Sequence, residues 1–338
     1  MKIPSNWDVG PWKEVSLSEG IRVVETPNFD IFCQFANLGF GDFDCRYLWR
    51  GQRRAEWEIT STLERAGGRD VDKLWIFRNA VARSSSTEYD MSNKNPHAEE
   101  VQTKLWALGQ HYGLATPLTD WTVYPYVALF FAFAEPEDGA AGFRAIFAID
   151  WESVSSVNYH ITQRDGMEPF KNKLENPPYS DEFKKYIEQN FGLRGDTAKL
   201  LEQSDIAQHM REAICTTQYE RLKAKQLRIY RPESTENRRM NCQGGWHMRT
   251  PEGTSVEAWI RANWKRLNEL RGFLPPDRLV PRIMTKVMIP NTERTAILRC
   301  LNKMNVNYLS LFPDLEGAAK YSNMAVKERR LGIGLREY

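Results

Sequence analysis

The sequence lacks any marked excess of charge of one sign. Its 338 residues include 46 basic and 44 acidic side chains, which leaves a formal net charge of +2. Because basic and acidic residues nearly cancel, the protein has no overall electrostatic field that would attract nucleic acid or a membrane surface. Only local charged patches could make such contacts. Cysteine is also scarce. The five thiols show no CxxC spacing, so we expect reduced buried thiols and no metal site.

Long apolar runs are absent as well. No stretch reaches the ~18 consecutive apolar residues of a membrane span, and the first residues (MKIPSNWDVGPWKEV) lack the apolar segment of a secretory signal. We therefore expect a cytoplasmic protein with no membrane partner. The sequence also lacks the GxxxxGK[ST], strand-linked GxGxxG, GxSxG and HExxH patterns, which argues against P-loop, Rossmann, serine hydrolase and zinc peptidase sites.

Hydrophobic residues at 41% and aromatic residues at 12% are sufficient for a large buried core. The apolar run Val127 to Ala134, with Pro125 suited to a first helical turn, predicts a buried helix. The pattern FRAIFAID at 143–150 predicts a strand beside it, and further strands are predicted at 47–50, 226–232 and 279–290. Together these elements indicate an α+β fold, in which a mixed sheet core carries flanking helices.

The composition along the chain predicts how it is organised. Residues 1–42 read as a lead-in and 321–338 as a basic C-terminal tail, on either side of a main domain. The charged segment at about 153–205 reads as an insertion in that domain, either a lid or partner surface or a solvated helical outcrop. The polar stretch 84–97 is expected to be a loop.

The stretch Leu105 to Phe133 concentrates polar and aromatic groups before the buried helix. Its first half contains Gln110, His111, Tyr112, Gly113, Thr116, Pro117, Asp120, Trp121 and Thr122. We interpret it as a loop anchored on a core helix, which is a common way to build a binding site. The alternative is structural, because Asp120 or Thr122 has the right chemistry for an N-cap of that helix.

A second candidate is Arg50, which follows an apolar run and precedes Gly51. The planar guanidinium can bind a phosphate or carboxylate with two hydrogen bonds, and glycine allows unusual backbone angles or close backbone approach. An ion pair with Asp42 or Asp44 is an equally good interpretation of Arg50.

Four segments resemble the pattern of the FRG-domain family, over about residues 43–320. They are Trp49-Arg50-Gly51-Gln52, then Gln110-His111-Tyr112-Gly113 with Thr116-Pro117-Leu118-Thr119-Asp120-Trp121-Thr122, then Arg239, Met240, Gln243 and Gly245, and finally Phe312-Pro313-Asp314-Leu315-Glu316-Gly317. In one position the chain departs from the family pattern, which has an arginine where this sequence has Pro117. The resemblance specifies the fold more closely than the reaction.

The side chains of these segments combine cations, neutral hydrogen-bonding groups, a carboxylate and aromatic rings, a set that suits a nucleotide. The arrangement is more distantly similar to the ADP-ribosyltransferase superfamily, which implies a cleft that binds NAD as a substrate. By that resemblance Arg50 grips NAD, Trp121 or Thr122 lines the nicotinamide, and Gln243 takes the third position. Breaking the glycosidic bond favours a carboxylate over an amide, so Asp120 is the alternative source of negative charge.

The candidate residues therefore fall into two groups. The catalytic candidates are Arg50, His111, Asp120 and Gln243, and the nucleotide-binding candidates are Arg50, Gly51, Gln110, Tyr112, Trp121, Thr122 and Arg239. Two functions remain open. One is an NAD-using effector, an ADP-ribosyltransferase or NAD glycohydrolase acting in bacterial antiviral defence or as a toxin on a protein or nucleic-acid target. The other is a nucleotide- or nucleic-acid-sensing module of a defence system, without chemistry of its own.

Overall fold

The structure is a computed structural model that describes residues 11–39, 46–67, 71–83, 98–136, 141–192, 206–231, 238–269 and 283–329. Asp42, Asp44, the predicted loop at 84–97 and residues 330–338 of the predicted tail lie outside these ranges. Contact clustering divides the chain into two compact units, one of residues 1–152 and 228–338 and the other of residues 153–227. Each unit is described by itself.

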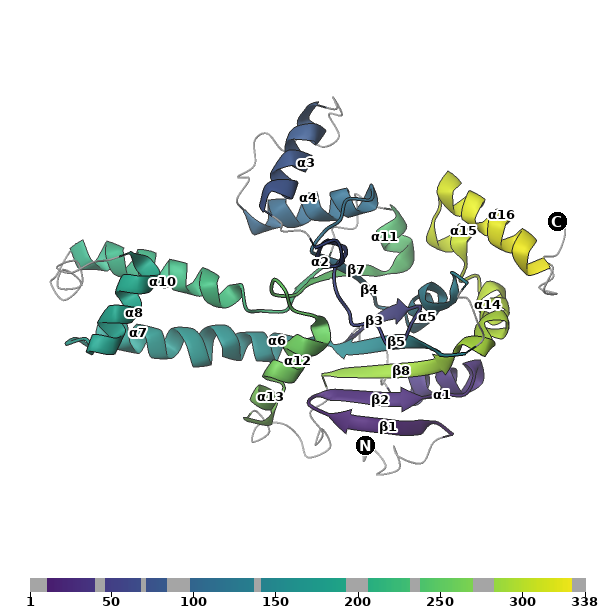
Figure 1. The fold of residues 1–338 in the computed structure, drawn as a ribbon, viewed down its shortest axis with the longest axis horizontal. Helices are drawn as coiled ribbons and strands as arrows, with labels where there is room; N and C mark the ends of the chain where they lie inside the picture. Colours follow the sequence, from purple (N-terminus) through teal and green to yellow (C-terminus); the bar gives the residue numbers. More distant parts are fainter. Residues whose placement is uncertain are drawn as a thin grey trace. The chain divides into compact units, whose positions relative to one another are not determined.

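The first unit is built on a mixed sheet, which confirms the predicted α+β class (Figure 1). Its strands are β1 (Lys13–Ser18), β2 (Ile21–Glu25), β3 (Tyr47–Gln52), β4 (Thr119–Thr122), β5 (Phe143–Asp150), β6 (Arg228–Tyr230), β7 (Gly245–Arg249) and β8 (Met284–Pro290). The strand order is β1-β2-β8-β5-β3-β4-β7-β6. The β2–β8 pair is parallel, and the other pairs are antiparallel.

The weakest junction in this sheet lies between β3 and β4. The two strands share a single bridge pair, Trp49 with Thr122. By contrast, β3 pairs with β5 at six positions and β4 pairs with β7 at four. We call this junction the β3–β4 seam. Because the seam has so few ladder hydrogen bonds, backbone groups along it need other partners.

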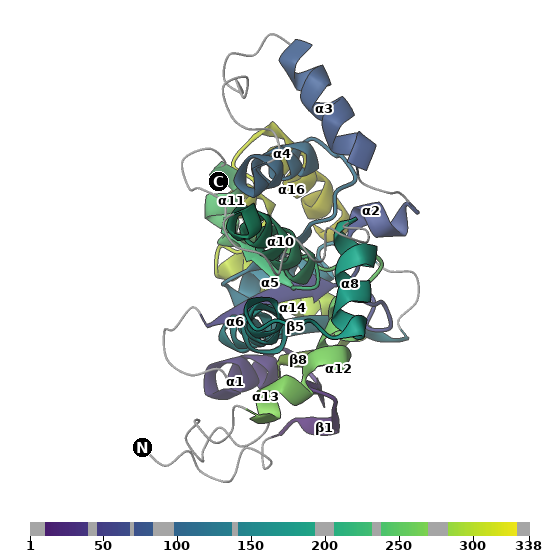
Figure 2. The same cartoon turned by 90° about the vertical axis from the view of Figure 1, so that its left-hand side faces the viewer.

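One face of the sheet carries the hydrophobic core. Side chains from β3, β5 and β8, among them Trp49, Ala148 and Val287, pack there against α1 (Phe29–Gly39), α5 (Pro125–Phe133) and α14 (Arg294–Lys303). Both views show α14 beside α5 (Figures 1 and 2). The helix predicted at the apolar run is thus confirmed, with Pro125 in its first turn.

Two arginines hold the C-terminal end of α5. Arg144 Nη1 donates to the carbonyl oxygens of Ala132 at 2.5 Å and Glu135 at 2.8 Å. Arg294 Nε donates to the carbonyl of Phe133 at 2.9 Å. Cations at this position satisfy carbonyls that have no partner within the helix and interact favourably with its dipole. The packing of α5 on the sheet is therefore fixed at its far end as well.

The opposite face of the sheet carries polar side chains beside buried apolar ones such as Leu48 and Ile149. Residues alternate between faces along a strand, so Arg50 points away from α5, as do Phe147 and Lys286, which stand in register with it on β5 and β8. Helix α12 (Val256–Asn263) approaches this face, and its Glu257 accepts a hydrogen bond from the backbone of Ile59 at 2.9 Å. The remaining elements of this unit are α2 (Thr62–Arg65), α3 (Val71–Arg83), α4 (Glu99–His111), α11 (Arg238–Gln243), α13 (Lys265–Glu269), the 3-10 turn Asn291–Glu293, α15 (Tyr308–Leu311) and α16 (Leu315–Arg329).

The prediction of a loop from Gln110 to Thr122 was wrong at both ends. Gln110 and His111 form the last turn of α4, which buries Val101, Leu105, Trp106 and Gly109 at helical spacing. At the other end, Asp120 and Thr122 belong to β4. Neither caps α5, whose N-cap is Tyr124 without a side-chain hydrogen bond. The predicted tail also begins inside a helix, because α16 continues to Arg329.

The second unit is helical in its described part. It contains most of α6 (Trp151–Tyr159), a π-helix at His160–Met167, α7 (Glu168–Glu175), α8 (Asp181–Phe191) and α10 (Ile206–Lys223). Phe170, Tyr179, Phe183, Ile187 and Ile214 form its core. The unit extends past residue 205, where we expected the insertion to end, because α10 packs along the π-helix. None of the helices in the described ranges has the length and apolar character needed to cross a bilayer.

A close backbone contact between β3 and α5 makes a testable prediction. A Cβ on Gly51 would stand 2.0 Å from the carbonyl oxygen of Ala128 and 2.6 Å from the backbone nitrogen of Ala132. We expect Gly51→Ala to lower the free energy of unfolding by about 3 kcal/mol, because backbone atoms of α5 cannot move aside as a side chain can. Chemical denaturation measures this change.

Gly109→Ala is the matched control. Its nearest contact would be the flexible end of the Leu114 side chain at 2.6 Å, and alanine favours the helix in which it lies. Equal stability losses in the two variants would contradict the account of Gly51.

Candidate functional site

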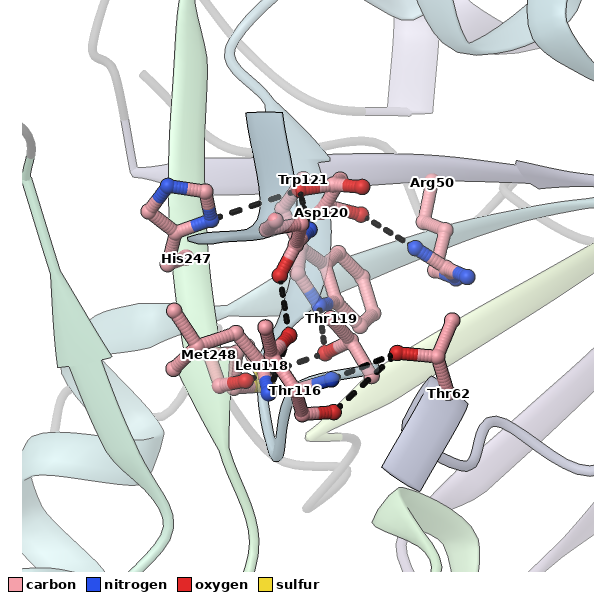
Figure 3. Close-up of polar contacts among 10 residues, drawn as sticks. Arg50, Thr62, Thr116, Leu118, Thr119, Asp120, Trp121, His247 and Met248 are labelled. Carbon is pink, nitrogen blue, oxygen red and sulfur yellow. Dashed lines mark hydrogen bonds and ion pairs between the residues drawn. The ribbon is translucent and has the colours of Figure 1, made fainter. Parts of the chain in front are cut away.

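Asp120 on β4 lies at the centre of a connected polar group. Gln110, in the last turn of α4, donates from Nε2 to Asp120 Oδ1 at 2.5 Å. His247, its register partner on β7, places Nδ1 at 3.3 Å from the same oxygen (Figure 3). No described residue donates a hydrogen bond to Oδ2, and 64% of the Asp120 side chain is exposed. The carboxylate is held on one side and open on the other.

The electrostatic surroundings keep Asp120 ionised. Protein atoms crowd the exposed carboxylate, and this desolvation by itself would raise the pKa of Asp120. The close approach of His247 at 3.3 Å, with the charge of Arg50, outweighs it and holds the pKa of Asp120 below its ordinary value. A group of this kind is a poor proton donor at neutral pH but a permanent negative charge.

Gln110 is itself oriented by a buried hydroxyl. Thr116 Oγ1 donates to Gln110 Oε1 at 2.5 Å, which leaves the amide nitrogen directed at Asp120. The backbone of Thr116 is fixed in turn by Thr62, whose hydroxyl accepts from Thr116 N at 2.9 Å and donates to Thr116 O at 3.2 Å. These contacts connect Thr62 of α2 to Thr116, Thr116 to Gln110 of α4, and Gln110 to the Asp120 carboxylate. The position of the carboxylate therefore depends on α2 and α4 as well as on its own strand.

The Arg50 side chain makes a hydrogen bond at the β3–β4 seam where a backbone ladder hydrogen bond is missing. Its Nη1 donates to the backbone oxygen of Asp120 at 2.6 Å, beyond the single bridge pair of the two strands. In the described part of the chain this is its only hydrogen bond, and no carboxylate lies within ion-pair distance of it. Its Nε is covered by protein and has no partner among those residues. A guanidinium with five donors and one acceptor is poorly satisfied.

Burial lowers the pKa of Arg50, and the nearby charge of Arg65 lowers it further. The carboxylates of Asp120 and Glu257 act in the opposite direction without forming a direct pair. The local electrostatics therefore favour an additional anion beside Arg50. The predicted ion pairs with Asp42 and Asp44 concern residues outside the described ranges.

Trp121 and Thr122 are buried and form hydrogen bonds within the fold. Trp121 is 2% exposed and donates from Nε1 to Thr119 Oγ1 at 3.0 Å, so its ring packs in the core. Thr122 is buried and donates to the backbone oxygen of Gln243 at 2.6 Å. Gly51 is covered by α5. These three predicted binding residues lie next to the polar group, and in this conformation they position it.

The third and fourth motifs contact each other. Arg239 forms ion pairs with Asp314 and, at 2.7 Å, with Glu316. Gln243 donates from its side-chain nitrogen to the carbonyl of Leu311 at 3.0 Å. Because Gln243 also accepts the hydrogen bond of Thr122, α11 links the segment at 311–316 to β4. Arg239 and Gln243 are thus engaged in contacts that hold the structure together.

His111 and Tyr112 lie at the end of α4, toward these motifs. Desolvation is the main cause that lowers the pKa of His111, and the charge of Arg239 lowers it further. The charges of Asp314 and Glu316 partly offset this decrease. Tyr112 is 67% exposed and meets His111 edge to face at 4.9 Å between ring centres. The structure therefore separates the predicted residues into a group at Asp120, with Arg50 and Gln110, and a second group around Arg239 with His111.

Sequence reasoning missed His247, Glu257 and Lys286. Desolvation raises the pKa of Glu257 and lowers the pKa of Lys286, and the two charges act on each other on the sheet face that Arg50 shares. His247 follows Gly245 at strand spacing, which marks it as a neighbour of the third motif. Its pairing with Asp120 depends on the β4–β7 register, which no local pattern encodes. The described residues contain no group of three or more His, Cys, Asp or Glu side chains arranged to hold a metal ion.

The α+β fold and this site can now be compared with known proteins. The family model described as FRG domain matches residues 45–141. The chain therefore contains an FRG domain, and the match includes the segments around Arg50 and from Gln110 to Thr122. The segments with Arg239 and Asp314 lie beyond it. No curated protein and no solved structure matched the chain, and nothing in these comparisons supports the more distant resemblance to ADP-ribosyltransferases.

The lowered pKa of Asp120 predicts a pH dependence of stability. Its folded pKa lies below the unfolded value, so its contribution is present above about pH 4, the unfolded pKa, and is lost as the pH falls through the folded pKa. Asp120→Asn preserves an acceptor for Gln110 but removes the charge. We expect the difference in melting temperature between the natural protein and this variant to shrink between pH 6 and pH 3. A difference that stays constant or grows toward pH 3 would contradict the assignment.

Proposed function

We propose that the β3–β4 seam binds NAD and breaks the bond between nicotinamide and ribose. The observation that carries this proposal is the juxtaposition of two incompletely satisfied groups of opposite charge. Arg50 has unused donors and no carboxylate partner among the described residues, and Asp120 beside it is ionised with Oδ2 free of described donors. A substrate with both an anionic and a cationic part would satisfy the two groups together.

Arg50 is the proposed ligand of the diphosphate. Its guanidinium is anchored through Nη1 to the backbone of Asp120, so its remaining donors are held in a fixed direction. Binding of a phosphate oxygen would satisfy donors that have no partner among the described residues, and charge-assisted hydrogen bonds are the strongest of their type. This accounts for a cation at a seam where a neutral side chain could have capped the backbone equally well.

Asp120 is the proposed group beside the reacting carbon. Departure of nicotinamide leaves positive charge on the ribose, and water or a target nucleophile then adds to that carbon and loses a proton. A carboxylate that stays ionised stabilises this charge as it develops. Gln110 and His247 keep the carboxylate in place, and the lowered pKa of Asp120 prevents its neutralisation at physiological pH. Gln243, which we had placed at this position, is engaged with Leu311 instead.

The product chemistry leaves two outcomes, hydrolysis to ADP-ribose or transfer of ADP-ribose to a protein or nucleic acid. Either would make the protein an effector of the kind used in toxins and antiviral defence. A second candidate is a nucleotide sensor without chemistry. The engagement of Gln243 and Arg239 in structural contacts favours it, since these residues are then unable to assist a reaction.

Nicotinamide release from NAD tests the proposal directly. We expect the purified protein to release nicotinamide, and Asp120→Asn to slow the release at least about a hundredfold, the typical loss when one stabilising group is removed from a developing charge. Gln243→Ala should retain most activity, because the amide lies outside the proposed chemistry. No release by the natural protein, combined with saturable NAD binding, would instead support the sensor.

Arg50→Lys separates binding from structure at the seam. Lysine keeps the positive charge but loses the planar fork, so we expect NAD affinity to fall about ten- to a hundredfold. The melting temperature should change little, because an ammonium can still donate to the backbone of Asp120. Calorimetric titration with NAD and a thermal melt of the same variant provide both values. A large drop in melting temperature with an unchanged affinity would identify Arg50 as structural only.

A further inference from the structure

Helix α2, which is attached beside the seam, ends with a second arginine, Arg65. Ser61 caps this short helix through a reciprocal capping box with Glu64. Thr62 then fastens the helix to the approach of β4 through its two hydrogen bonds with Thr116. Figure 3 shows Thr62 and Arg50 on one side of the segment from Thr116 to Asp120, opposite His247. The turn that carries Arg65 is thus fixed to the strand that Arg50 contacts.

Arg65 is exposed and only partly engaged. Its Nη1 donates to the carbonyl of Thr60 at 2.5 Å, which orients the guanidinium from its own loop. Within the described ranges it forms no ion pair with a carboxylate. Two guanidinium groups repel each other, and an anion bound to both would replace this repulsion with attraction. The lowered pKa of Arg50, to which Arg65 contributes, agrees with that proximity.

The segment from Thr116 to Thr122 contains no lysine, arginine or histidine of its own. The residue after Thr116 is Pro117, so the approach to β4 supplies no positive charge there. Helix α2, whose Thr62 and Leu63 both contact Thr116, brings the charge of Arg65 close enough to act on Arg50. The two arginines come from β3 and α2, so they can contact different oxygen atoms of one ligand.

We propose that Arg50 and Arg65 together form a diphosphate-binding pair, in which each guanidinium takes one phosphate of a dinucleotide. This inference rests on the proposed function of the seam and names the residue that would complete its anionic half. A diphosphate fits better than an extended polyanion, because the chain has a net charge of only +2 and Glu257 lies close enough to act on Arg50. The site requires a compact anion with two charged groups.

Titration of the full-length protein with inorganic pyrophosphate and with ADP tests the pair. Arg65→Gln removes the charge from an exposed side chain and leaves the capping box of α2 intact, so the fold should persist. We expect affinity for both ligands to fall about tenfold, the loss of one charge-assisted contact. Arg164→Gln, at an exposed arginine of the second unit, makes the same chemical change and should have no effect.

A double-mutant cycle on Arg50→Gln and Arg65→Gln shows whether the two act on one ligand. Non-additive losses of pyrophosphate affinity are expected, because both side chains contact the same molecule. Failure of the natural protein to bind pyrophosphate, or equal affinity in the Arg65 and Arg164 variants, would overturn the pair. If Arg65→Gln unfolds, Arg65→Lys replaces it, with weaker binding expected from the loss of the fork.

The cycle also distinguishes this inference from the proposed reaction. Pyrophosphate binding that depends on both arginines, together with an absence of nicotinamide release, would retain the pair and reject the chemistry. Release of nicotinamide that is unaffected by Arg65→Gln at limiting NAD, with pyrophosphate binding also unchanged, would retain the chemistry and reject the pair.

Discussion

The contact between α5 and β3 at Gly51 is the constraint on which the site depends. The backbone of α5 comes so near that any side chain at this position would overlap the carbonyl of Ala128. With that face of β3 filled by the helix, the neighbouring Arg50 must point to the opposite face. There β3 and β4 have stopped pairing, and the guanidinium takes over the backbone oxygen of Asp120. The packing of α5 on one face of β3 thus leaves Arg50 on the other face, where it spans the seam.

The four sequence motifs divide their tasks around this seam. The first supplies Arg50 and the glycine that admits α5, and the second supplies Gln110 and Asp120. The third and fourth hold each other through Arg239 and its two carboxylates, and they reach the second through the hydrogen bond from Thr122 to Gln243. Motifs that look alike as polar clusters in the sequence therefore differ in role, since some face the seam and others fix the elements that surround it.

The sequence was informative where a pattern is local. The apolar run before Ala134 identified α5, and the alternation at 143–150 identified β5. It was misleading where polar residues interrupt a helix at its end, so that Gln110 and His111 were assigned to a loop although buried Leu105 and Gly109 share their helix. His247 could not be predicted from the sequence, because its position beside Asp120 follows from the register of two strands that are 127 residues apart. Arg65 was overlooked because α2 is a single turn. Tertiary pairing of this kind leaves no local signature.

The central claim is that NAD occupies the β3–β4 seam, and amide hydrogen exchange with and without NAD tests its location most directly. A ligand held by Arg50 and Asp120 would tie together strands that share one bridge pair, and would slow local opening there. The account predicts new protection in 47–52, 62–65 and 116–123, with little change in the second unit at 153–192. Protection confined to other segments, or none at saturating NAD, would contradict it.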